Sequence, residues 1–166
     1  MSVNNEVHVI GLRGMPIVQP DDDIAELIVT AAAKQGASIQ DRDVIAVTQR
    51  IVSRSEHQLR RLDDFEPSRF AIDYANQTEK DPRLVEAVLS ESSRVIRQVG
   101  GVLITETRHG FRCANAGVDG SNVGGEEFVC LLPIAPDASC LRIREGIAKH
   151  TRADVAVIMP DTFGRP

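Results

Sequence analysis

The sequence predicts an α+β fold with mixed, largely antiparallel sheets flanked by helices. Short apolar segments bounded by turn residues, such as 43–48 and 154–159, are typical of strands. Segments with a capping residue and one apolar face, such as 23–35, are typical of amphipathic helices. The chain has 166 residues, of which 42% are hydrophobic. That length is enough to bury a core in one domain or in two small subdomains.

The first elements are predicted from alternation and capping. Residues 6–10 alternate polar and apolar side chains, which predicts a strand. A helix is expected between Asp23 and Gly36, because Asp21–Asp23 can accept hydrogen bonds from the free N–H groups of a first turn and suit the helix dipole. The alternative for these three aspartates is a metal-binding cluster. Segment 43–48 is a nearly continuous apolar run, so we expect it to be buried on both faces of a sheet.

The same signals place the other elements along the chain. A helix from Glu66 to Asn76 is followed by a helix that begins at Asp81 and Pro82. Apolar strands are expected at 102–104 and 128–132. The last elements are a helix capped by Asp137, with Leu141, Ile147 and Ala148 facing inward, and a buried strand at 154–159.

Composition excludes several classes of function. The net charge is −5, and the chain has no Trp and one Tyr, which argues against a nucleic-acid-binding protein. Three cysteines without a CxxC pair predict free thiols in a reducing cytoplasm. We find no signal-peptide pattern at the N-terminus and no apolar run of membrane-spanning length, so we expect a cytoplasmic protein without a membrane partner.

The most informative segment is 107–125, which lies between two apolar strands and is rich in glycine. Glycine lets the backbone approach a ligand closely, and successive N–H groups can hold an anion. Asp119 is a hard oxygen ligand of the kind that Mg²⁺ or Mn²⁺ prefers. This pattern favours a metal–phosphate site, and the alternative is a Gly-rich hairpin with an Asp turn. His109 is either an acid–base group or a structural side chain.

Two further groups of polar residues follow predicted strands. Gln49, Arg50 and Arg54 come after the first buried strand, in the position where α/β sheets keep ligand sites. The arginines either contact a phosphate or are solvated surface residues. Asp161 and Thr162 follow the last strand and resemble the Asp and Thr pairs that hold Mg²⁺ against phosphates, with a strand-ending turn as the alternative. The usual nucleotide motifs, GxxxxGK[ST] and a GxGxxG after a strand, are absent.

Several segments in collinear order resemble one known family, the coenzyme F420-0:L-glutamate ligases, which are γ-glutamyl ligases of deazaflavin biosynthesis. Residues 107–123 match the family pattern TRHGFVCANAGVDxSNV almost residue for residue, which is a highly specific similarity. The other matching segments are 14–17 with the acidic 21–23, 47–56 (family pattern VTQKIVSKAEG), 80–85 (KDPRLVE) and 161–166 (DTFGRP).

The resemblance implies a GTP-dependent ligase. In the implied reaction, GTP phosphorylates the terminal carboxylate on the phospholactyl arm of coenzyme F420-0. The amine of L-glutamate then attacks the acyl phosphate and forms an amide. This chemistry needs a divalent metal, Mg²⁺ or Mn²⁺, to neutralise the triphosphate, and groups that hold two substrates in line. A monovalent cation is also compatible with the resemblance, and the family is usually homodimeric.

The resemblance also assigns roles to residues by position, although it gives no certain catalytic residue and no role to His109 or Asn115. The metal ligands that it implies are Asp119, Asp161 and Thr162. The guanine-nucleotide site that it implies consists of Met15, Pro16, Ile17, Val18, Gln49, Arg50, Arg54 and Asn122.

The chain departs from the family pattern in several places, one of which is His57, where Gly is usual. Arg54 stands where Lys is usual, which replaces a point charge by a planar fork. Pro160 stands where Ser is usual and removes a backbone donor beside Asp161. Family chains continue beyond this sequence, so residues 1–166 are expected to be the N-terminal part of a ligase domain, with the C-terminal part absent. Two alternatives stay open: a nucleotide- or deazaflavin-binding module without turnover, and a subunit that needs a second chain.

Overall fold

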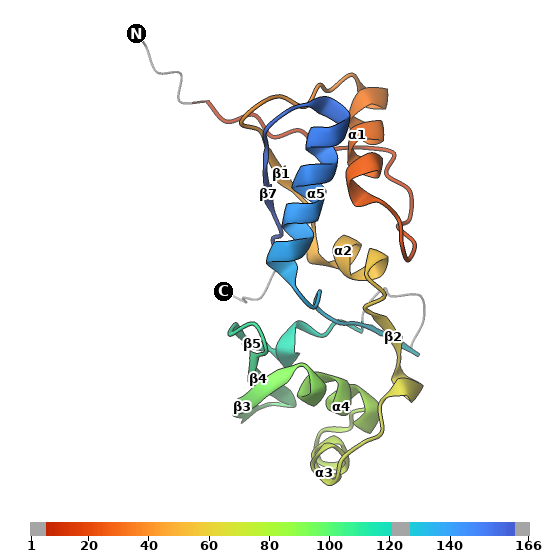
Figure 1. Ribbon diagram of the computed structural model, residues 1–166. Coiled ribbons are helices and arrows are strands. Elements are labelled where there is room, and N and C mark those ends of the chain that lie inside the picture. The colour runs from red at the N-terminus through yellow and green to blue at the C-terminus, as the bar shows by residue number, and fades with distance from the viewer. Residues whose placement is uncertain (1–5, 121–126, 162–166) are drawn as a thin grey trace.

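The computed structural model describes residues 6–120 and 127–161, which form two halves joined by a short ribbon (Figure 1). The parallel half, at the top of Figure 1, contains α1 (Ile24–Gln35), β1 (Val44–Ala46), α2 (Gln49–Ser55), α5 (Pro136–Thr151) and β7 (Ala156–Ile158). The meander half, at the bottom, contains the 3₁₀ turn η1 (Leu62–Asp64), α3 (Arg69–Thr78), α4 (Pro82–Ser90), β3 (Ser92–Val99), β4 (Val102–Thr107), β5 (Arg112–Ala114) and the 3₁₀ turn η2 (Asn115–Gly117). The ribbon consists of β2 (Leu59–Arg61) and β6 (Phe128–Cys130).

The strands form three small sheets. β1 and β7 pair in parallel, β2 and β6 pair antiparallel, and β3, β4 and β5 form an antiparallel meander. The prediction of an α+β fold with mixed, largely antiparallel sheets flanked by helices is therefore confirmed. Within residues 6–120 and 127–161, no helix is both long enough and apolar enough to cross a membrane.

The helix starts are set by side-chain caps. Asp23 begins α1, because its Oδ1 accepts hydrogen bonds from the backbone N–H groups of Ala25 and Glu26. Ser68 caps α3 in the same way, and Asp81 caps α4, with a proline at the first helical position. The Asp81 carboxyl also receives hydrogen bonds from the Arg83 guanidinium, which lower its pKa. The predicted helix starts at Asp23 and Asp81 are confirmed, whereas the helix predicted from Glu66 begins at Arg69.

The core of the parallel half lies between α1 and α5. Ile28 of α1, Ile147 of α5 and Val52 of α2 belong to one buried cluster that packs beneath β1 and β7. The two long helices approach each other closely at Gly146, where an added Cβ would lie 2.5 Å from the Cβ of Ala25. Glycine is therefore required at this crossing for steric reasons.

The core of the meander half lies between its two helices and β4. Leu103 of β4 packs against Tyr74 of α3 and Val85 of α4, and Ala116 of η2 closes the same cluster. β4 alternates strictly, with Leu103, Thr105 and Thr107 buried and the intervening residues partly exposed. This alternation is that of a strand with one covered face.

Two expectations for the strands of the parallel half are wrong. Residues 6–10 form no strand, and Val7 and Val9 are 88% and 90% exposed. No strand in the described ranges lies beside them to supply ladder hydrogen bonds. β1 and β7 are not buried on both faces, because this sheet has two strands within the described residues and only Ile45 and Val157 face the cluster beneath.

Two further expectations are corrected. α5 begins at Pro136 after Ala135, so Asp137 lies in the first turn and is not the cap, and Leu141 is exposed instead of inward-facing. The longest strand, β3, was not predicted. Its pairing with β4 contains two register shifts, and most of its side chains are exposed, so its sequence lacks a clear alternation.

The helix crossing gives a stability prediction. Gly146→Ala should destabilise the chain by about 1–3 kcal/mol, because the new methyl group overpacks the contact with Ala25. In an ordinary helix the same change stabilises by up to about 1 kcal/mol, so the sign of the effect is diagnostic. Urea unfolding monitored by circular dichroism measures it. The control is Glu145→Ala on the exposed side of α5, which should stay within about 0.5 kcal/mol of the parent; a stabilised Gly146→Ala variant would contradict the packing.

Candidate functional site

A large cavity, with a volume of about 1040 Å³, lies where the two halves meet. Its walls come from the start of α2, from β4 and β5, and from the segment that follows η2. Gln49, Arg50, Asp119 and Asp161, which are far apart in the sequence, all line it. We call it the central cavity.

α2 is held in place by hydrogen bonds to one backbone carbonyl. The Nε2 of Gln49 donates to the carbonyl oxygen of Leu131 over 2.9 Å, and the Oγ of Ser53 donates to the same oxygen over 2.7 Å. Gln49 also donates to Ser53 over 2.6 Å, and both side chains are buried. Because buried polar groups without partners are costly, this network determines how α2 sits against β6.

The neighbouring residue, Arg50, forms an ion pair with Asp119 across the central cavity. Asp119 is held by a backbone bridge to Cys130, with its N–H donating to the Cys130 carbonyl over 3.1 Å and its carbonyl accepting over 2.8 Å. Each side chain of the pair is about one third exposed, at 38% for Arg50 and 32% for Asp119. The pair therefore lies in a partly desolvated site, where a cation or an anion can compete for either partner.

The turn before Asp119 has unusual backbone angles. Asn115, Ala116 and Gly117 have φ values of 51°, 53° and 71°. Positive φ is uncommon for residues other than glycine and marks local strain. The turn is supported by the Asn115 side chain, which accepts a hydrogen bond from Leu103 N–H over 3.2 Å, and by the fully buried Ala116. It redirects the chain from β5 so that Asp119 reaches the cavity.

Asp161 follows β7 and lines the same cavity beside Cys113. Burial raises the pKa of the Cys113 thiol, and the charge of Asp161 raises it further, so this thiol is protonated at neutral pH. Asp119 and Asp161 are the kind of oxygen donors that suit Mg²⁺ or Mn²⁺, with phosphate oxygens and water completing the shell. Within the described ranges there is no cluster of three or more His, Cys, Asp or Glu side chains that could hold a metal without such help.

Comparison with known families identifies the family of this chain. A family model described as F420-0:Gamma-glutamyl ligase matches residues 13–166. The chain belongs to this family. The resemblance inferred from the sequence motifs is thereby confirmed.

Curated relatives in the γ-glutamyl ligase family are similar along most of this chain. A protein named coenzyme F420:L-glutamate ligase from Methanothermobacter thermautotrophicus is 44% identical over 160 residues, which is 96% of this chain and 63% of that protein. A protein of the same name from Methanopyrus kandleri is 43% identical over 90% of this chain and 57% of its own length. Another from Haloarcula marismortui is 39% identical over 96% of this chain and 62% of its own length. The chain spans about three fifths of the length of these relatives.

The central cavity brings together four of the residues expected in the γ-glutamyl ligase site, namely Gln49, Arg50, Asp119 and Asp161. Asn122 and Thr162 lie outside the described residues. The cavity also includes residues for which no role was predicted. Of these, Arg112 lies on β5 and pairs with Glu106 over 3.2 Å, and nothing in the sequence motif distinguishes it from a surface arginine.

Met15, Pro16, Ile17, Val18 and Arg54 do not line the central cavity. Met15 packs against the core of the parallel half, Val18 is buried, and Ile17 is 74% exposed. The Nε of Arg54 is buried without a hydrogen-bond partner in the described structure. Their role in nucleotide binding stays a prediction.

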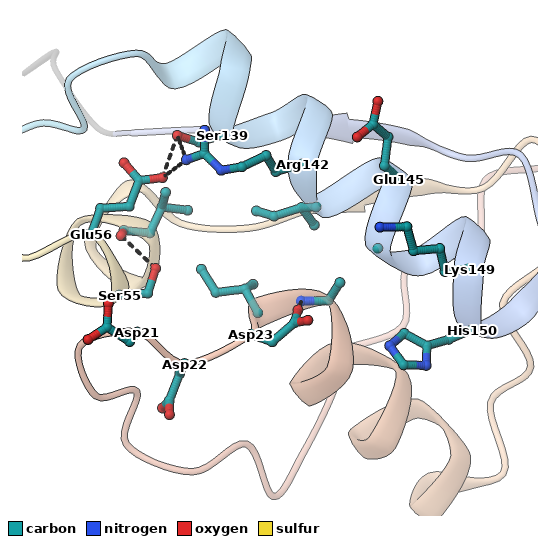
Figure 2. Close-up of a pocket in the computed structure, with 15 residues that line it drawn as sticks. Asp21, Asp22, Asp23, Ser55, Glu56, Ser139, Arg142, Glu145, Lys149 and His150 are labelled. Carbon is teal, nitrogen blue, oxygen red and sulfur yellow. Dashed lines mark hydrogen bonds and ion pairs between the residues drawn. The ribbon is translucent and has the colours of Figure 1, made fainter.

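A second cavity, of about 400 Å³, lies between the start of α1, the end of α2 and α5 (Figure 2). Glu56 closes one end by accepting hydrogen bonds from Ser139 over 2.5 Å and from Arg142. The three aspartates that line this cavity do not converge. Asp23 caps α1, Asp22 accepts from the backbone N–H of Gln19, and Asp21 pairs with His57. Helix capping and local turn contacts therefore explain Asp21–Asp23, and the alternative of a metal-binding cluster does not.

His109 does not line the central cavity. Its Nε2 lies 3.2 Å from the carbonyl oxygen of Ile134, so it connects the Gly-rich loop to the segment that precedes α5. Its ring is tilted against Phe111, with centroids 6.5 Å apart. These contacts match the structural interpretation of this residue.

The hydrogen-bond network beneath Arg50 gives a second prediction. Ser53→Ala should destabilise the chain by about 1–3 kcal/mol, because it removes a buried donor to Leu131 and leaves part of the network unsatisfied. Ser38→Ala is the matched control, since Ser38 is exposed and only accepts a hydrogen bond from Gln40. Denaturant titrations compare the two variants. Equal stability of Ser53→Ala and Ser38→Ala would show that the network does not hold α2.

Proposed function

We propose that the chain forms the nucleotide- and metal-binding part of a GTP-dependent ligase, which joins L-glutamate to coenzyme F420-0 in the biosynthesis of coenzyme F420. The observation that carries the proposal is the convergence of Gln49, Arg50, Asp119 and Asp161 on one cavity in a member of the γ-glutamyl ligase family. The names of the relatives, coenzyme F420:L-glutamate ligase, support the substrates.

The proposed reaction has two steps. The terminal carboxylate of the phospholactyl arm attacks the γ-phosphorus of GTP, which forms an acyl phosphate and releases GDP. The amine of L-glutamate then attacks the acyl carbon, loses a proton and expels inorganic phosphate, which leaves an amide. Both steps depend mainly on holding the reacting groups in line and on stabilising charge on the phosphoryl oxygens.

The residues of the central cavity suit these requirements. Asp119 and Asp161 would hold a divalent cation, Mg²⁺ or Mn²⁺, which when bound neutralises charge on the triphosphate. Arg50 lies at the same point and is the cation nearest to Asp119 in the described structure. When a metal ion occupies Asp119, the Arg50 guanidinium becomes available to a phosphate, for which its planar fork is well shaped. A homodimer is part of the same proposal.

Calorimetric titration of the 166-residue chain tests the nucleotide site. GTP should bind in the presence of Mn²⁺, more weakly without it, and in preference to ATP. Asp119→Asn should weaken Mn²⁺-dependent GTP binding by at least about tenfold, because loss of groups around a metal ion costs about 10–100-fold in affinity. The fold should remain intact, which circular dichroism checks.

Asp154→Asn is the matched control, because Asp154 is exposed and pairs with Arg144 over 2.7 Å, away from the central cavity. Its GTP affinity should equal that of the parent chain. Unchanged affinity in Asp119→Asn would remove Asp119 from the site. A ligase assay with F420-0, L-glutamate, GTP and Mn²⁺ tests the reaction itself, and nucleotide binding without amide formation would favour the binding-module hypothesis over the ligase.

Arg50 gives a sharper prediction, because its loss should change the affinities for Mn²⁺ and for GTP in opposite directions. Arg50→Gln should raise the affinity for Mn²⁺ alone by several-fold, since the internal ion pair with Asp119 no longer competes. The same variant should bind GTP about tenfold more weakly at saturating Mn²⁺, since a charged hydrogen bond to phosphate is lost. Arg112→Gln removes an equal charge from the cavity wall without touching that pair. If both variants change Mn²⁺ affinity equally, the effect is general electrostatics and not competition by Arg50.

A further inference from the structure

A smaller cavity lies on the other side of the turn that carries Asp119. It has a volume of about 270 Å³ and is enclosed by α3, α4, β4 and the segment 115–120. Asn115, Val118 and Asp119 line both this cavity and the central cavity. We call it the side cavity. One short segment of chain therefore separates two chambers, and Asp119 belongs to both.

The side cavity is mainly apolar but contains two polar groups that lack partners. Its walls include Leu84, Val88 and Leu103. The hydroxyl of Tyr74 is buried and forms no hydrogen bond in the described structure. The ammonium group of Lys80 has no hydrogen bond or ion pair with any described residue. A buried hydroxyl is normally satisfied in folded proteins, so a ligand oxygen is a natural partner for Tyr74. Lys80 is partly exposed and supplies a cation on the wall of the same cavity.

Both groups are held by their surroundings. Tyr74 is 5% exposed, and its ring stacks on Phe70 with centroids 6.1 Å apart and planes within 6°. The Lys80 stem packs against the turn between β3 and β4, since a Cβ at Gly101 would lie 3.7 Å from its Cε. The adjacent carboxylate, Asp81, does not neutralise Lys80, because it binds the Arg83 guanidinium over 2.7 Å. The Lys80 ammonium is therefore not neutralised by the carboxylate next to it in the sequence.

We propose that the side cavity binds the amino-acid substrate, with a carboxylate of L-glutamate on the Lys80 ammonium and the Tyr74 hydroxyl. The proposal rests on the ligase function proposed above, in which the amine must meet an acyl phosphate that forms beside Asp119. One cation and one neutral donor match a single carboxylate. A phospholactyl arm carries a phosphate as well and is attached to a deazaflavin ring, for which this volume is too small.

L-Glutamate titrations of the 166-residue chain test the assignment, with and without Mn²⁺ and a non-hydrolysable GTP analogue. Lys80→Met should weaken L-glutamate binding by about tenfold or more, because a hydrogen bond to a charged group is lost. Tyr74→Phe should weaken it by several-fold while the ring keeps its packing. Lys149→Met is the matched control, because Lys149 lies on α5 in the other half and should leave L-glutamate affinity unchanged.

The outcomes of these titrations distinguish failure of the L-glutamate assignment from failure of the proposed function. If L-glutamate does not bind in any condition, or binds Lys80→Met as well as it binds the parent, the proposal is overturned. If 2-phospholactate depends on Lys80 and L-glutamate does not, the cavity binds the other carboxylate substrate and the amino-acid assignment is wrong. Mn²⁺–GTP binding should be unchanged in Lys80→Met. If the parent chain does not bind GTP but still binds L-glutamate through Lys80, the proposed function fails and the carboxylate site remains.

Discussion

The arrangement of the molecule depends on the carbonyl oxygen of Leu131, which accepts hydrogen bonds from both Gln49 and Ser53. The donors come from α2 in the parallel half. The side chain of Leu131 packs with Ala87 of α4 in the meander half. One residue therefore couples the two halves, through a buried polar contact on its backbone and an apolar contact on its side chain. Buried hydrogen bonds of this kind specify a unique arrangement, because every alternative leaves donors unsatisfied.

This coupling also positions the residues of the central cavity. It brings Arg50 from α2 to Asp119, which follows the meander, and the cavity between the halves forms around that pair. The strained turn at Asn115 and Ala116 is the wall between the central and side cavities, and the buried Ala116 holds it against the core. Strain at such a turn is tolerated only where the surrounding packing over-determines it. This strained turn thus leads into Asp119, one of the residues that line both cavities.

Local signals in the sequence predicted a large part of this structure. Asp23 and Asp81 marked helix starts because capping depends on neighbouring residues alone, and the Gly-rich block marked Asp119 because its motif is contiguous. Features that depend on distant residues were missed or wrong. The exposure of β1 depends on what covers its outer face, and β3 is defined by irregular pairing. Tyr74 and Lys80 line one cavity only because α4, β4 and the segment 115–120 complete its walls. The family match covers residues 13–166 and accounts for the motif, yet it gives no role to this pair.

The most direct test of the central claim is a crystal structure of the chain with Mn²⁺ and a non-hydrolysable GTP analogue, in which anomalous scattering locates the metal ion. The account predicts a manganese peak between Asp119 and Asp161, with the triphosphate in the central cavity and Arg50 released from Asp119 to a phosphate oxygen. A manganese peak at the aspartates that precede α1, or a nucleotide bound between α1 and α5, would contradict it.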